Sequence, residues 1–69
     1  QLILEDLRAI DRMLAKLSSK SRAAFLHSRL DGMTHGEIAE RLGVSVPRVR
    51  QYLAQGIRQC YIALYGEPT

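Results

Sequence analysis

Two helix-start signals with a single glycine between them constrain this chain more than any other feature of its sequence. Thr34 and Glu37 have the spacing of a capping box, in which each side chain satisfies a free backbone N–H at the start of a helix. Ser45 followed by Pro47 is a second such signal, because proline in a first helical turn loses no hydrogen bond. Gly43 lies between them and can adopt the left-handed conformation that ends many helices. The spacing predicts a short helix, a tight turn and a longer helix.

Residues 34–57 therefore predict a helix-turn-helix. Ala39 is a small residue where the second helix of the motif would cross the first. The expected apolar contacts of this crossing are Ile38, Leu42, Val44, Val49 and Leu53. From Ser45 to Tyr65 the chain has three arginines and no acidic residue, which suits a helix that contacts phosphates and base edges. The alternative is an ordinary helical hairpin with a solvated basic face.

The rest of the chain also has a helical period. Apolar residues spaced by three and four predict a first helix with the stripe Ile3, Leu7, Ile10, Leu14 and Leu17. Ser18 or Ser19 is expected to cap a second helix that ends at Asp31-Gly32, with the apolar face Ala23, Phe25, Leu26 and Leu30. The last helix is expected from about Val46 to Leu64 or Tyr65, with the stripe Val49, Leu53, Ile57, Cys60, Tyr61 and Leu64. No segment has strand alternation, so the expected fold is an all-α, four-helix domain over residues 1–69.

Size and composition argue against an enzyme. A chain of 69 residues buries only a modest core, and its single cysteine, Cys60, excludes an internal disulfide and a cysteine-rich zinc site. His27 and His35 have no Cys, Asp or Glu constellation at ligand spacing, so we expect no catalytic residue, no metal and no cofactor. The net charge of +3 favours an acidic partner such as nucleic acid. No apolar run approaches the ~20 residues that span a bilayer, and we expect a cytoplasmic protein.

Three stretches of the sequence resemble region 4 of bacterial sigma factors of the extracytoplasmic-function (ECF) class. They are residues 17–25, 30–39 and 41–50, and the finer resemblance is to the iron-siderophore uptake, FecI-like group. The resemblance implies a domain that recognises the −35 promoter element for RNA polymerase, docks on the flap of the polymerase β subunit and is covered by an anti-sigma regulator. It also implies a longer protein with region 2 upstream. The alternatives are the output domain of a response regulator and a protein-interaction module that binds no DNA.

The resemblance assigns roles to individual residues. The expected base-contacting residues are Arg48, Arg50, Gln51, Ala54 and Gln55. The expected phosphate-contacting residues are Thr34, Arg41, Ser45, Tyr52 and Arg58. Pro47, Tyr52 and Gln55 depart from the commoner ECF pattern, in which a glycine and two arginines are frequent, and this departure predicts weak DNA binding by the domain alone.

The first helix carries more apolar residues than one face can bury. Leu2, Ile3 and Leu4 are consecutive and therefore point in different directions around a helix. We expect a protein-docking surface formed by Leu2, Ile3, Leu4 and Leu7; packing against an upstream linker is the alternative.

Overall fold

The structure, a computed structural model, describes residues 2–66, with side chains from Leu7 to Gly66. Four helices follow one another along the chain: α1 (Leu2–Lys16), α2 (Ser19–Arg29), α3 (His35–Leu42) and α4 (Val46–Tyr65). The part of the chain that the structure describes contains no strand. The all-α, four-helix prediction is confirmed.

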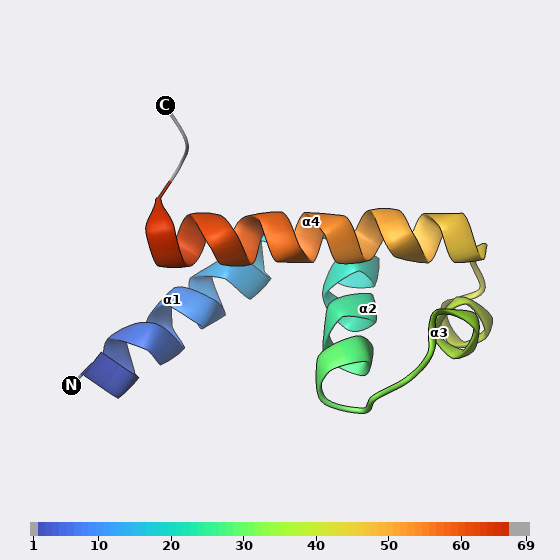
Figure 1. Cartoon of the computed structure of the whole chain (residues 1–69), viewed down its shortest axis with the longest axis horizontal. Coiled ribbons are helices and arrows are strands. Elements are labelled where there is room, and N and C mark those ends of the chain that lie inside the picture. The colour runs from blue at the N-terminus through green and yellow to red at the C-terminus, as the bar shows by residue number, and fades with distance from the viewer. Residues whose placement is uncertain (1, 67–69) are drawn as a thin grey trace.

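The long helix α4 organises the molecule. Figure 1 shows α1, α2 and α3 on one side of α4, with α3 below its N-terminal end and α1 below its C-terminal part. Each of these three helices packs against α4, and α2 also packs against α3. The opposite side of α4 is left uncovered over most of its length.

The predicted start of α2 is correct, but the helix ends slightly before the predicted Asp31-Gly32. Ser18 is the N-cap, and its hydroxyl accepts a hydrogen bond from the backbone N–H of Ser21 at 3.2 Å. The helix ends at Arg29, and Leu30 is its C-cap. Leu30 is 77% exposed, so its assignment to the apolar face of α2 was wrong. This side chain lies beyond the last helical turn and has no core to face.

The main core cluster lies where α2, α3 and α4 meet. It consists of Ala24, Ile38, Ala39, Val49 and Leu53, and partly buried apolar side chains including Leu42 and Val44 pack against it. The predicted contacts of the helix crossing are thus confirmed.

The apolar stripe of α1 differs from the prediction. Met13 and Leu17 are buried, whereas Leu7 is 56% and Ile10 is 39% exposed. Figure 1 shows the reason: the C-terminal end of α1 approaches α4, and its N-terminal end diverges from the other helices. Apolar periodicity identifies the face of a helix that could be buried, but not how much of its length has a neighbour.

The contact between α2 and α4 contains two residues that the sequence did not single out, Ser21 on α2 and Gly56 on α4. Ser21 is fully buried, and its hydroxyl donates a hydrogen bond to the carbonyl oxygen of Tyr52 at 2.9 Å. Gly56 is buried against Phe25, and a Cβ built at Gly56 would overlap the phenylalanine ring. A glycine within a helix costs about 1 kcal/mol relative to alanine, so its presence was the signal for a close packing contact.

Candidate nucleic-acid interface

The turn between α3 and α4 has the geometry that the sequence predicted. Gly43 is the C-cap of α3 in the left-handed conformation, with φ 69° and ψ 37°. The backbone N–H of Val44 donates to the carbonyl oxygen of Ala39 at 3.0 Å, which closes the turn. Because Ile38, Val49 and Leu53 are buried at the crossing, the two helices of the motif are held against each other by a continuous apolar contact.

Both helices of the motif begin at hydroxyl N-caps. The backbone N–H of Thr34 donates to Glu37 Oε1 at 2.8 Å, and the N–H of Glu37 donates to Thr34 Oγ1 at 3.2 Å. Hydrogen bonding of the Glu37 carboxyl by Thr34, first through its backbone N–H and then through its side chain, holds the pKa of this carboxyl below its ordinary value. Ser45 Oγ accepts from the backbone N–H of Arg48 at 3.3 Å. The hydroxyl of Ser45 therefore still has its O–H donor available for an anion, whereas the Thr34 side chain is engaged by the Glu37 carboxyl.

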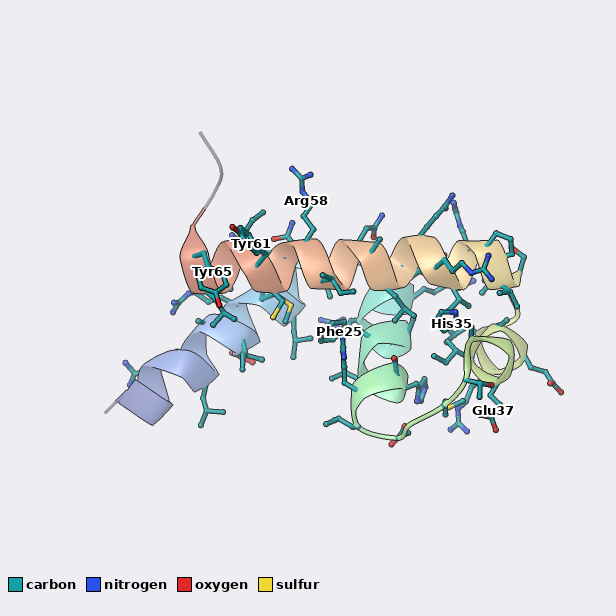
Figure 2. The ribbon with its side chains drawn as sticks, viewed as in Figure 1. Phe25, His35, Glu37, Arg58, Tyr61 and Tyr65 are labelled. Carbon is teal, nitrogen blue, oxygen red and sulfur yellow. The ribbon has the colours of Figure 1, made fainter. Side chains whose placement is uncertain are left out.

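The N-terminal half of α4 presents a polar, basic surface to solvent. Val49, Leu53 and Gly56 form its buried side. All five residues that the resemblance assigned to base contacts are exposed: Arg48, Arg50, Gln51, Ala54 and Gln55. Arg58 is exposed as well, and Figure 2 shows it extending from α4 away from the other three helices. The structure therefore brings these residues onto one helix surface, which is the arrangement that a major-groove contact requires.

Arg48 is held in place by two neighbours. Its Nη1 donates to Gln51 Oε1 at 3.0 Å, and its guanidinium carbon lies 5.5 Å from the centre of the Tyr52 ring. The bond occupies the amide oxygen of Gln51 and leaves its NH₂ group able to donate, for example to a purine acceptor in the major groove. Arg48 and Gln51 can thus approach DNA as a coupled pair.

Tyr52 is half-buried and packs against the core cluster. Its ring therefore lies at the edge of the core, under the Arg48 guanidinium, where it supports α4. The role of its hydroxyl at a phosphate stays a prediction.

Arg41 has two acidic residues beside it in the lining of one hollow. It is exposed in the last turn of α3 and borders an open hollow of about 420 Å³ with Met33, Glu37 and Glu40. None of the other predicted phosphate-contacting residues lines this hollow. The acidic neighbours oppose binding of an anion there, so a phosphate contact by Arg41 stays a prediction.

The predicted docking surface falls mostly outside the described side chains. Leu2, Ile3 and Leu4 belong to α1, but their side chains lie outside the described residues. Leu7 is described and is 56% exposed, as a docking residue requires.

A second apolar surface, beside α4, was missed by the sequence analysis. A groove of about 450 Å³ runs between α1, α2 and the C-terminal half of α4, with Ile10, Phe25, Ile57, Tyr61, Leu64 and Tyr65 among its lining residues. Ile57, Tyr61 and Leu64 were predicted to be core, but they are 53%, 57% and 50% exposed. The buried side of α4 is formed by Val49, Leu53 and Gly56 instead.

The two histidines and the cysteine lie on three different helices: His27 on α2, His35 on α3 and Cys60 on α4. His27 Nδ1 on α2 lies 2.7 Å from Oδ2 of Asp31, four residues later and just beyond the helix, a pair that the sequence analysis overlooked. Among the described side chains, Leu7 to Gly66, no group of three or more from His, Cys, Asp and Glu could hold a metal ion. No helix in this range combines the length and the hydropathy needed to cross a membrane.

Comparison with known proteins identifies the family. The family described as "Sigma-70, region 4" matches residues 7–60. The chain is similar to the ferric citrate uptake sigma factor FecI of Escherichia coli (strain K12), with 48% identity over 59 residues. That match covers 86% of this chain and 34% of the relative, so the chain spans about a third of the relative's length. No solved structure matches it. The match decides against the output domain of a response regulator, and the chain belongs to the sigma-70 region 4 family.

Proposed function

We propose that this domain recognises the −35 promoter element on behalf of an ECF sigma factor and thereby directs RNA polymerase to its promoters. The observation that carries the proposal is the exposed surface of α4 that follows the helix-turn-helix turn. This surface gathers three arginines and two glutamines without an acidic side chain, and it begins at an N-cap that can receive a phosphate.

Within this proposal, the residues divide into two groups. Arg48, Arg50, Gln51, Ala54 and Gln55 lie in the major groove, where arginine pairs with guanine, glutamine with adenine and alanine with the thymine methyl group. Thr34, Arg41, Ser45, Tyr52 and Arg58 contact phosphates and fix the orientation of the domain. The domain acts as a binding module and not as an enzyme.

The proposed partners and target genes are inferred from the similarity to FecI. A sigma factor named for ferric citrate uptake suggests that this chain belongs to a longer cytoplasmic sigma factor, of which residues 1–69 form region 4, and that it serves iron-uptake genes. Its partners are the promoter, the flap of the polymerase β subunit and an anti-sigma regulator. The flap meets α1 on a surface formed by Leu2, Ile3, Leu4 and Leu7, of which Leu7 is exposed.

A salt titration of binding to a library of DNA duplexes tests the proposal. We expect the logarithm of the binding constant to fall linearly with the logarithm of the salt concentration, with a slope of roughly −0.9 per phosphate contact. We also expect a preferred sequence. Binding that has no sequence preference, or no salt dependence, would instead support a protein-interaction module whose basic helix serves an acidic protein.

A further inference from the structure

The side chains of Arg48, Gln51 and Tyr52 contact one another near the N-terminal end of α4. Arg48 Nη1 donates to Gln51 Oε1 at 3.0 Å, and the guanidinium carbon of Arg48 lies 5.5 Å from the centre of the Tyr52 ring. Residues three and four positions apart share one face of a helix, so both neighbours can hold the same guanidinium. Arg50 belongs to another part of the α4 surface, because it lines a hollow between α2 and α4 together with Phe25.

Tyr52 is the anchored member of these three residues. Its side chain is half-buried and packs against the core cluster, whereas Arg48 and Gln51 are exposed. The carbonyl oxygen of Tyr52 also accepts a hydrogen bond at 2.9 Å from the hydroxyl of Ser21, which is fully buried on α2. The Tyr52 ring is therefore held by its packing and by its backbone, and it offers the exposed arginine a fixed surface to lie on.

We propose that Tyr52 is a positioning residue of promoter recognition, which holds the Arg48 guanidinium in the orientation that contacts a base before DNA binds. This inference deepens the proposed function and rests on it. An arginine side chain loses rotational freedom when it docks on a base, and a side chain that is already oriented loses less. The aromatic ring attracts the guanidinium through its π face and leaves the N–H donors free at the guanidinium edge. Gln51 uses one of these donors, and others remain for the two acceptors of a guanine.

This role belongs to the Tyr52 ring and differs from the phosphate contact proposed for the Tyr52 hydroxyl. A hydroxyl that donates to a phosphate strengthens binding to every duplex alike. A ring that orients Arg48 strengthens binding only to duplexes with the preferred base pair beside Arg48, because only these use the oriented donors. The two contributions can be separated, since phenylalanine keeps the ring without the hydroxyl, and leucine keeps apolar packing without a π face.

Binding to a library of DNA duplexes tests the inference, with Arg48→Ala identifying the base pair that Arg48 reads. At this base pair, Tyr52→Leu should reduce the ratio of affinities between the preferred and the other bases by about threefold to fivefold, as expected for loss of an exposed cation–π contact. Tyr52→Phe should keep the wild-type ratio while all duplexes bind more weakly. Adding Tyr52→Leu to Arg48→Ala should change the ratio no further. Tyr61→Leu is the matched control, because Tyr61 lies about 14 Å further along α4 and packs beside Tyr65.

Two further readouts separate positioning from a structural role. The base pair that Arg50→Ala identifies should keep its selection in Tyr52→Leu, whereas a loosened α4 would lose selection at both base pairs. In the free domain, NMR should show a ring-current shift of the Arg48 side-chain protons in wild type and Tyr52→Phe, and its loss in Tyr52→Leu.

Full selection in Tyr52→Leu, or an equal loss of selection in Tyr52→Leu and Tyr52→Phe, would overturn the inference. It would also be overturned by equal loss at both base pairs, by an Arg48→Ala variant with unchanged selection, or by unshifted Arg48 protons in the free wild type. A wild-type domain that shows the ring-current shift but prefers no sequence would instead contradict the proposed function, and this inference would fail with it.

Discussion

At the scale of single residues, substitutions of Arg50 and Arg58 distinguish the proposed base contact from the proposed phosphate contact. Both are exposed on α4, but Arg50 lies close to the turn and Arg58 lies about two helical turns further along. Arg50→Ala should cost roughly 1–3 kcal/mol on the preferred duplex and relax selection at one base pair. Arg58→Ala should weaken all duplexes equally and reduce the salt slope by about one contact. Binding to a duplex library measures both effects, and an unchanged preference in Arg50→Ala would contradict direct readout.

The close contact between Gly56 and Phe25 leads to a prediction about stability. Alanine at this position gains helix propensity, but its Cβ would overlap Phe25, and overpacking of this kind costs typically about 1–3 kcal/mol. We therefore expect Gly56→Ala to lower the free energy of unfolding in urea. Gly36→Ala is the control, because Gly36 is helical and exposed and a Cβ there meets only Thr34 Oγ1 at 4.0 Å. If both variants were equally stable, the packing of α2 on α4 would be looser than the structure shows.

Substitutions at Gly43 test the conformation of the turn between α3 and α4. Its φ of 69° lies in a region that β-branched residues avoid, so Gly43→Val should cost more than about 1 kcal/mol. Gly43→Asn should lose much less, because asparagine tolerates the left-handed conformation. Thermal unfolding followed by circular dichroism compares the two. A valine variant with the wild-type Tm would mean that the turn does not need this conformation.

At the scale of the elements, the capping box of α3 links stability to pH. The hydrogen bonds from Thr34 lower the pKa of Glu37 from its ordinary value of 4.5, so the unfolded chain binds more protons than the folded one at mildly acidic pH. The stabilisation from this group is therefore present above its ordinary pKa and is lost as the pH falls through the lowered value. Glu37→Gln keeps an acceptor without the titration, so the stability difference between wild type and variant should shrink on acidification. Urea unfolding from neutral pH down to about pH 3 measures this, and a constant difference would contradict the linkage.

The same elements show what the sequence could and could not predict. Helix starts and the turn depend on local chemistry, so Ser18, Thr34, Gly43 and Ser45 were identified in advance. Burial depends on neighbours that are distant along the chain. Periodicity alone therefore assigned Ile57, Tyr61 and Leu64 to the core, although the structure leaves all three exposed. The exposure of the base-contacting set was predictable because it lies opposite Val49 and Leu53 on the same helix.

At the scale of the whole molecule, the small core leaves two apolar surfaces uncovered. The cluster at the meeting of α2, α3 and α4 stabilises the helix-turn-helix, while α1 packs on α4 chiefly through buried Met13 and Leu17. Leu7 and Ile10 on α1 and Ile57, Tyr61 and Leu64 on α4 remain exposed as a result. The proposed DNA-contacting surface therefore lies in the N-terminal half of α4, and the exposed apolar side chains Tyr61 and Leu64 lie towards its other end.

The flap surface on α1 can be tested without disturbing this core. Leu7 is 56% exposed, so Leu7→Ser should preserve the helical circular dichroism and the affinity for duplex DNA. If the β-subunit flap buries this side chain, the loss of its apolar contact should weaken binding of a flap fragment by about tenfold or more. Leu30→Ser is the matched control, because Leu30 is 77% exposed just beyond α2 and lies outside the proposed surface. Flap binding that survives Leu7→Ser, or that falls equally in Leu30→Ser, would leave α1 as a scaffold and move the flap contact to another part of the domain.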